Sequence, residues 1–432
     1  MAQSLAFPPQ TLAQKLIAKA AGVPHAAQGS IVNCKVDLAM FHDSSGPRRL
    51  KPMLEELGAQ IWDRSKVVLV MDHFVPEEDD DSRRIVRIAR DWAREQALPH
   101  VYDSQGICHV VLPQKGHLRP GMFCVGGDSH SPTGGAFGSY MFGIGSTEML
   151  GVMVTGEIWV KVPRTVRMRW EGDLQPGVSA KDMMLHMIAR FGMNGGDYQA
   201  IEFAGSTVRS LGMAERMTLS NMSAELGAQV GLIAPDATTA SWLAAAGVTV
   251  DDAQLARWQS DAGTAVTEHV FDAAALPPMV AVPHSPANGR PVKELVGQPI
   301  DLAYIGACTG AKLEDLQAAA QILQGRHVAA GVRLLVAPAS LRDLAQAREQ
   351  GVMQSLQEAG AELLPSACGA CAGYGQAVQG TTRVIATTAR NFKGRMGSAE
   401  AQVFLASPYT VAASALAGCV TDPRELLKGV VL

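Results

Sequence analysis

Three cysteines lie in loops made almost entirely of small residues, and thiolate sulfur suits zinc and iron–sulfur centres. Cys368 and Cys371 are three residues apart in SACGACAG, and Cys308 lies in GACTG, between a predicted strand and a predicted helix. Their small neighbours would let the backbone come close to a bulky inorganic group. Three thiolates are one short of a closed zinc site or an ordinary four-cysteine iron–sulfur cluster.

These cysteines leave several interpretations open. The two in SACGACAG could be small buried residues or a thiol-redox pair, although a redox pair normally lies early in a βαβ unit. If instead all three cysteines bind metal, either a histidine completes the site or the fourth position is open. An open position is what catalysis on a bound substrate requires.

Acidic residues and histidines form a second group, concentrated in the first 130 residues. A carboxylate beside an imidazole raises the pKa of the imidazole and fixes its tautomer, which makes a general acid at neutral pH. The sequence has no HxxxH or HExxH spacing to indicate zinc. The candidates lie in DLAMFHDSSGP, MDHFVP, GICHV and GGDSHSPTGG: His42 with Asp43, Asp72 with His73, His109, and Asp128 with Ser129 and His130.

The elements that must carry these residues alternate between short apolar runs and helical patterns, which predicts an α/β fold. In open α/β sheets, ligands bind beyond the carboxyl ends of the strands. Strands are expected at residues 66–70, 122–125 and 383–389, and a further strand is expected to begin at residue 301. Helices are expected at residues 11–20 and beginning at residues 79 and 312. The residues that follow these strands, and that we expect to meet at one crevice, are Asp72–His73, Asp128–His130, Cys308 and Arg390.

Length and composition exclude several classes of protein. The chain has 432 residues, is 47% hydrophobic and 18% charged, and carries a net charge of −4 with no basic stripe, so nucleic acid is not an expected partner. The longest clean apolar run, residues 67–71, is too short for a bilayer, and the N-terminus lacks a signal-peptide pattern. The seven cysteines are an odd number spread sparsely along the chain, which argues against a disulfide framework. We expect a soluble, cytoplasmic protein with free thiols and no membrane partner.

Breaks in composition predict the domain organisation. Residues 283–298 are rich in proline, asparagine and glycine, and a softer break lies at 171–179. We therefore predict three α/β units: residues 1–172 with the acid–histidine pairs, residues 173–297, and residues 298–432 with the three cysteines.

The ordered set MDHFVP, GGDSHSPTGGAFG, GACTGAKLEDL, SACGACAG and ARNFKGRMG resembles the aconitase superfamily, particularly its 3-isopropylmalate dehydratase and homoaconitase large-subunit branch. The resemblance runs from DLAMFHDSSGP to the C-terminus. It implies three α/β/α units around a central cleft, without the swivelling C-terminal domain of aconitases. It also implies a hydro-lyase for a small hydroxy di- or tricarboxylic acid, with a [4Fe–4S] cluster whose fourth iron is open to substrate.

Motif by motif, the resemblance implies a role for each candidate residue. Cys308, Cys368 and Cys371 would hold the cluster, and the Asp72–His73 pair would protonate the departing hydroxyl. Two further implied residues come from LSNMSAELGAQ, which resembles the family's Asn-Met-x-Ala-Glu segment. The rest of the implied site comprises the pairs His109–Asp128 and His130–Glu225, and His42, Ser129, Asn221, Arg390 and Arg395 around the substrate.

Two departures from the family pattern concern the substrate. After the first cluster cysteine, relatives commonly have Thr-Asn, whereas this chain has Thr309–Gly310. Relatives also have Asn-Arg-Asn-Phe where this chain has ARNF, at residues 389–392. The two missing amide side chains leave isopropylmalate, homoaconitate, dimethylmalate and a methylmalate or maleate-type acid as candidate substrates.

The base that removes the carbon-bound proton is expected on another chain. In aconitases a serine of a Ser-Ser-Arg-Glu-type segment in the swivelling domain has this role, and the sequence up to Leu432 has no such segment. The resemblance therefore implies a separate small subunit that supplies the catalytic serine. The rival interpretations are a zinc or thiol-redox protein and a regulatory RNA-binding protein, and the net acidity disfavours the second.

Overall fold

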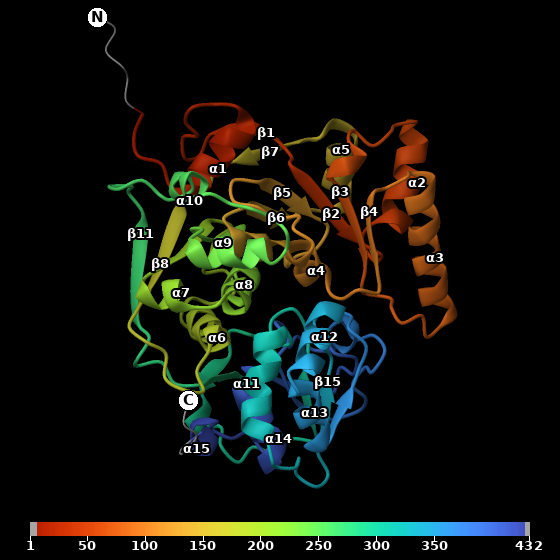
Figure 1. Ribbon diagram of the computed structural model, residues 1–432, viewed down its shortest axis with the longest axis vertical. Coiled ribbons are helices and arrows are strands. Elements are labelled where there is room, and N and C mark those ends of the chain that lie inside the picture. The colour runs from red at the N-terminus through yellow and green to blue at the C-terminus, as the bar shows by residue number, and fades with distance from the viewer. Residues whose placement is uncertain (1–6, 428–432) are drawn as a thin grey trace, which may run out of the picture.

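The computed structural model describes residues 7–427, so the first six residues and the last five, which include part of the N-terminal stretch considered above and Leu432, lie outside the described residues. The described elements form three groups, each built on a main β-sheet (Figure 1). In the figure the first group is red to orange, the second yellow to green, and the third teal to blue. The α/β class predicted from the sequence is confirmed.

The first group holds a five-stranded parallel sheet with the order β4-β3-β2-β5-β6. Strands of a parallel sheet are covered on both faces and are therefore apolar throughout, and β3 is buried at all five positions. An antiparallel ribbon, β1-β7, completes the group. The elements are α1 (Leu12–Ala21), β1 (Ile31–Lys35), β2 (Leu38–His42), α2 (Pro47–Leu57), β3 (Val67–Met71), α3 (Asp80–Glu95), β4 (His100–Asp103), α4 (Cys108–Gln114), β5 (Phe123–Gly126), β6 (Tyr140–Gly143), α5 (Ser146–Thr155) and β7 (Glu157–Lys161).

The second group holds a four-stranded parallel sheet with the order β10-β9-β8-β11. Helix α6 lies at the side of this group that faces the third group (Figure 1) and contacts β12 and β13 there. The elements are β8 (Thr165–Glu171), α6 (Ala180–Phe191), β9 (Ala200–Ala204), α7 (Ser206–Ser210), α8 (Met213–Met222), β10 (Val230–Ile233), α9 (Ala237–Ala244), α10 (Asp252–Arg257) and β11 (Thr267–Asp272).

The third group holds a seven-stranded sheet with the order β13-β12-β18-β17-β14-β15-β16. Strand β12 runs antiparallel to both of its neighbours, β13 and β18, and the five strands from β18 to β16 are parallel. The elements are β12 (Met279–Ala281), β13 (Gly289–Pro291), β14 (Leu302–Ile305), α11 (Leu313–Leu323), β15 (Arg333–Val336), α12 (Leu341–Glu349), α13 (Val352–Glu358), β16 (Ala361–Leu363), β17 (Arg383–Ala386), β18 (Gln402–Ala406), α14 (Pro408–Ala417) and α15 (Arg424–Leu427).

The strand pairings can be compared with the predicted boundaries of the three units, but they do not fix where one unit ends. Strand β8 pairs with strands of the second sheet, although all of it precedes residue 172. Residues 283–298, expected as a linker, contain β13, which pairs with β12 in the third sheet. The division at 1–172, 173–297 and 298–432 stays a prediction.

Signals in the local sequence account for where several helices and strands begin and end. Helix α1 begins after Thr11, whose side chain accepts from Gln14 in a capping box, and ends at Gly22 with a φ of 68°. Helix α3 carries Asp80 and Asp81 in its first turn, where they suit the helix dipole. The expected strands are found as β3, β5, β14 and β17, and each ends directly before a loop that bears candidate site residues.

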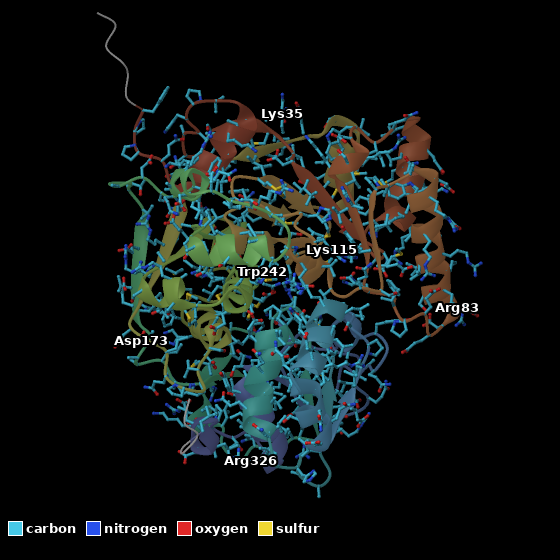
Figure 2. All side chains as sticks on the ribbon, viewed as in Figure 1. Lys35, Arg83, Lys115, Asp173, Trp242 and Arg326 are labelled. Atoms are coloured by element: carbon cyan, nitrogen blue, oxygen red, sulfur yellow. The ribbon has the colours of Figure 1, made fainter. Side chains whose placement is uncertain are left out.

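Charged side chains surround the whole outline of the molecule, for example at Arg83, Asp173 and Arg326 (Figure 2). Among the described residues, no helix has the length and apolar character needed to cross a membrane.

Candidate active site

The predicted site residues meet where the loops after β3, β5, β14 and β17 come together. The backbone N–H of Cys368 donates to the Asp72 carbonyl at 2.8 Å, which joins the cysteine loop of the third group to the end of β3. Arg390 Nη1 donates to Ser129 Oγ at 2.9 Å and so joins the loop after β17 to the loop after β5. These bonds bring the loop after β3 into contact with the loop of Cys368, and the loop after β5 into contact with the loop after β17.

The first acid–histidine pair is Asp72 with His73. His73 Nδ1 lies 2.8 Å from Asp72 Oδ1, and Asp72 Oδ2 accepts from the Cys108 N–H at 2.7 Å. Burial alone would lower the pKa of His73, but the Asp72 carboxylate raises it to about 9. The ring of His42 stacks on that of His73 with centroids 3.9 Å apart. This arrangement holds His73 as an imidazolium with its Nδ1 already engaged.

Asp43 fixes the backbone beneath this pair. Its carboxylate accepts the backbone N–H of His73 at 3.1 Å and that of Phe74 at 2.8 Å. Burial and the nearby Asp72 carboxylate raise the pKa of Asp43. The sequence analysis grouped Asp43 with His42, but the structure gives it this supporting position behind His73.

The second pair is His109 with Asp128, whose atoms Nε2 and Oδ1 lie 2.7 Å apart. The same Asp128 oxygen accepts the backbone N–H of His130 at 2.7 Å, and His42 Nε2 lies 3.5 Å from Oδ2. Although burial opposes it, the His109 imidazole holds the pKa of Asp128 well below its usual range. A β-carbon on Gly143 would lie 2.5 Å from the Asp128 carbonyl, so glycine is needed where β6 passes this loop.

The third pair joins residues 95 positions apart, His130 and Glu225, with Nε2 and Oε1 separated by 2.9 Å. Arg390 Nε donates to the same Glu225 oxygen at 2.6 Å. Glu225 is fully buried, and the charges of His130 and Arg390 lower its pKa despite that burial. Asn221 lies in the last turn of α8 and Glu225 in the turn that follows this helix, so both come from the second group.

The three cysteines lie next to these pairs. Cys308 follows Ala307, which has a left-handed φ of 67° that is uncommon for a residue with a side chain. Asn221 Nδ2 donates to Cys308 Sγ at 3.2 Å. Burial raises the pKa of Cys308 to about 12, whereas a hydrogen bond from Cys368, helped by Arg395, lowers the pKa of Cys371 to about 5.

The donor set fits a polynuclear cluster better than a single zinc ion. Two sulfurs bound to one zinc at about 2.3 Å lie at most about 4.6 Å apart. Among the described residues, ligand atoms gathered within 4.8 Å occur in two acid–histidine groups, and the three cysteines do not form such a group. In addition, Arg395 Nε is buried without a partner beside Cys371, which leaves a donor for a further sulfur or anionic ligand.

Lys181 contacts the loop of Cys308 and is not among the residues predicted from the sequence. Its ammonium donates to the carbonyls of Thr387 at 2.9 Å and Thr388 at 2.6 Å, and to Thr309 Oγ1 at 3.2 Å. Burial lowers its pKa to about 8. A lysine in the helical pattern SAKDMM gives no signal of this position, since lysines of helices are usually exposed.

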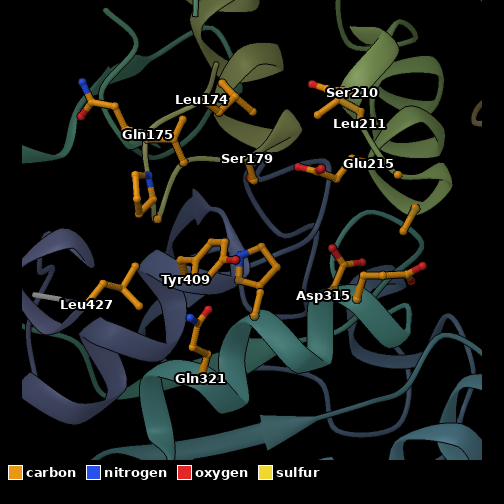
Figure 3. A pocket seen from close by; sticks show the side chains of 18 of the residues that line it. Leu174, Gln175, Ser179, Ser210, Leu211, Glu215, Asp315, Gln321, Tyr409 and Leu427 are labelled. Carbon is orange, nitrogen blue, oxygen red and sulfur yellow. The ribbon is translucent and has the colours of Figure 1, made fainter. Parts of the chain in front are cut away.

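Two cavities differ in their relation to this site. One of about 430 Å³ is lined by Asp128, Ser129 and Arg390 and opens beside the acid–histidine pairs. Another of about 400 Å³ lies between α6, α8, α11 and α14, and none of the predicted site residues lines it (Figure 3). Two of its carboxylates cap helices: Glu215 accepts the N–H of Ala180 at 3.1 Å, and Asp315 that of Lys312 at 3.0 Å. Of these two cavities, the first is the one lined by predicted site residues.

Comparison with known proteins identifies the family. The sequence profile of the aconitase family (aconitate hydratase) matches residues 14–299 and 294–418. The chain belongs to the aconitase family. The family assignment and the hydro-lyase class expected from the motifs are thereby confirmed.

Similar proteins of this family match nearly the whole chain. The 3-isopropylmalate dehydratase large subunit 1 of Methanopyrus kandleri is 42% identical, covering 97% of this chain and 100% of its own length. The 3-isopropylmalate dehydratase large subunit of Desulfatibacillum aliphaticivorans is 40% identical, with 96% and 99% covered. A probable methanogen homoaconitase large subunit of Methanosarcina mazei is 41% identical, with 90% and 99% covered.

A solved structure agrees with the fold. The holo-form of Thermococcus kodakaraensis aconitase X superposes with a TM-score of 0.50 over 85% of this chain and 89% of that one, at 13% sequence identity. The predicted aconitase-like α/β architecture is confirmed at the level of the fold.

Proposed function

We propose that this chain is the large subunit of an iron–sulfur hydro-lyase that removes water from 3-isopropylmalate and adds it back. The observation that carries the proposal is the 2.8 Å hydrogen bond between Cys368 N–H and the Asp72 carbonyl, because it places the cysteine loop beside an imidazolium that can donate a proton. The substrate follows the names of the Methanopyrus kandleri and Desulfatibacillum aliphaticivorans relatives.

In the proposed mechanism, His73 is the general acid. Its Nδ1 is held by Asp72 at 2.8 Å, so the proton for the departing hydroxyl comes from Nε2. A pKa of about 9 keeps the imidazole protonated at neutral pH. Cys308, Cys368 and Cys371 would hold the [4Fe–4S] cluster, which supplies an open iron as a Lewis acid when bound.

Arg390 and Ser129 are placed to receive a substrate carboxylate. A guanidinium matches a carboxylate through two parallel hydrogen bonds, and Arg390 lines the 430 Å³ cavity while Glu225 and Ser129 hold its orientation. The pairs His109–Asp128 and His130–Glu225 would order the water and the remaining polar groups of the substrate. Arg395 and Asn221 would face the cluster side of the same space.

The carbon-bound proton needs a base that these residues are poorly suited to be. The pKa values of Asp128 and Glu225 are lowered, and a carboxylate of low pKa is a weak base. We assign the base to a serine of a small subunit, since the relatives carry the name large subunit. The proposed location is the cytoplasm, where the free cysteines would stay reduced.

A second substrate candidate is homoaconitate, favoured by the relative in Methanosarcina mazei. A β-carbon on Gly310 would lie 2.1 Å from Thr387 Cβ, so the asparagine common at this position in relatives does not fit here unless Thr387 moves. This local difference from relatives lies next to Cys308. Dimethylmalate and methylmalate or maleate-type acids should therefore also be tested as substrates.

The test is a substrate panel on the chain combined with its small subunit under anoxic conditions after cluster reconstitution. The expected result is dehydration of 3-isopropylmalate with a higher kcat/KM than for the other hydroxy acids, and little turnover by the large subunit alone. A colourless protein with stoichiometric zinc, or strong turnover without the small subunit, contradicts the proposal.

A further inference from the structure

Lys181 is a buried ammonium whose hydrogen-bond partners are all uncharged. Its side chain extends from the first turn of α6, and the residue is 1% exposed. Its three acceptors are two backbone carbonyls and the hydroxyl of Thr309. Among the described residues, no carboxylate oxygen lies within 4.0 Å of this ammonium, whereas the buried Lys312 has Asp315 at 2.8 Å.

An ammonium buried among neutral groups is costly unless a negative charge lies nearby. Lys181 lies against the residue that follows Cys308, since its ammonium donates to Thr309 Oγ1 at 3.2 Å. Metal binding requires the thiols of its ligands to be deprotonated. A cluster held by these cysteines would therefore bring anionic sulfur close to this ammonium.

The same ammonium ties together two loops of the third sheet. Thr309 follows Cys308 after β14, and Thr387 and Thr388 follow β17 and lead to Arg390. Thr309 Oγ1 also donates to the Thr387 carbonyl at 2.8 Å, so the loops contact each other directly beneath Lys181. Lys181, which comes from the second group, thus bridges the loop of Cys308 and the loop after β17 that leads to Arg390.

We propose that Lys181 is a positioning residue for the cluster: its ammonium anchors the Cys308 loop to the Thr387–Thr388 segment and supplies a counter-charge to the cysteine thiolates. This inference rests on the proposed function for its cluster part only. The anchoring of the two loops is a property of the chain itself.

The test compares Lys181→Met, Lys181→Arg and the exposed-lysine control Lys115→Met in the full chain. Hydrogen exchange of the cluster-free chain, read at residues 306–311 and 387–390, measures the anchoring. Loss of visible absorbance in the presence of a chelator measures retention of the reconstituted cluster. The expected result for Lys181→Met is faster exchange in both loops and cluster loss accelerated about 10- to 100-fold, the range seen when residues behind metal ligands are removed.

The variants separate the two parts of the proposal. Lys181→Arg keeps the positive charge, so this variant should retain the cluster nearly as well as the wild type. If Lys181→Arg loses the cluster as fast as Lys181→Met does, the proposal that Lys181 supplies a counter-charge is refuted. Unchanged exchange in Lys181→Met overturns the anchoring. If Lys181→Met does not fold, Thr309→Val removes one acceptor and must speed exchange in both loops, and unchanged exchange again refutes the anchoring. A wild-type chain that takes up no cluster refutes the proposed function and the counter-charge, while the exchange measurement still decides the anchoring.

Discussion

Replacing Asp72 by asparagine should move the pH range in which the enzyme works. Asp72 is fully buried and holds His73 Nδ1 at 2.8 Å. Burial lowers the pKa of His73, and the Asp72 carboxylate overcomes this and raises it to about 9. Asparagine keeps the size of the side chain and can still accept a hydrogen bond but carries no charge. The pKa of His73 in Asp72→Asn should therefore fall to its ordinary value of about 6.5 or below.

The magnitude follows from the two pKa values. At pH 8, a group with a pKa of about 9 is about 90% protonated, and one with a pKa of about 6.5 is about 3% protonated. Because only the imidazolium can donate the proton, dehydration at pH 8 should slow about 30-fold, and at pH 6 much less. The shift corresponds to about 3 kcal/mol between the two protonation states.

The same shift links pH to folding. The pKa of His73 is raised in the folded state, so its stabilising contribution is complete below about pH 6.5 and is lost as the pH rises through about 9. In Asp72→Asn this contribution should be absent. Urea unfolding at pH 6 and pH 9.5 measures the difference between the two proteins.

The assay is kcat/KM of the reconstituted two-subunit enzyme between pH 6 and pH 10. The matched control is Asp80→Asn, which removes an exposed carboxylate in the first turn of α3. The expected result is a basic limb that moves to lower pH in Asp72→Asn alone. If the basic limb stays in place while the rate falls equally at all pH values, Asp72 does not set the protonation of His73 and the reasoning is refuted.

Three further predictions concern the substrate, the cluster and the fold. Arg390→Lys loses the paired geometry of the guanidinium, so kcat/KM should fall about 10- to 100-fold with an unchanged visible spectrum; a wild-type kcat/KM contradicts this. Cys308→Ser should abolish the visible absorbance after anoxic reconstitution while Cys419→Ser keeps it, and equal spectra refute the ligand assignment. Arg216→Met leaves Asp236 without the guanidinium that it accepts from at 2.7 Å. Its free energy of unfolding in urea should therefore drop by about 1.5–3 kcal/mol, the range of hydrogen bonds to charged groups, and a change below about 1 kcal/mol would show the pair to be dispensable.

The sequence alone determined the elements and much of the site. The apolar run VVLVM, the capping box of Thr11 with Gln14, and the acids that open α3 are signals between near neighbours in the chain, so they predict strands and helices directly. Because ligands of open α/β sheets bind beyond the carboxyl ends of the strands, the positions of Asp72 and Cys308 in loops that follow β3 and β14 also predicted that both would border one crevice. The order of the motifs predicted the family.

The tertiary structure alone decided which partner each reactive group has. His130 and Glu225 are 95 residues apart, and nothing in their local sequences specifies a separation of 2.9 Å. Lys181 has the local pattern of a helix surface, yet packing of α6 against the third sheet buries it beside Thr309 and Thr387. The physical reason is that propensity and periodicity act over a few residues, whereas burial, hydrogen-bond partners and pKa values depend on atoms that only the packing of three sheets brings together.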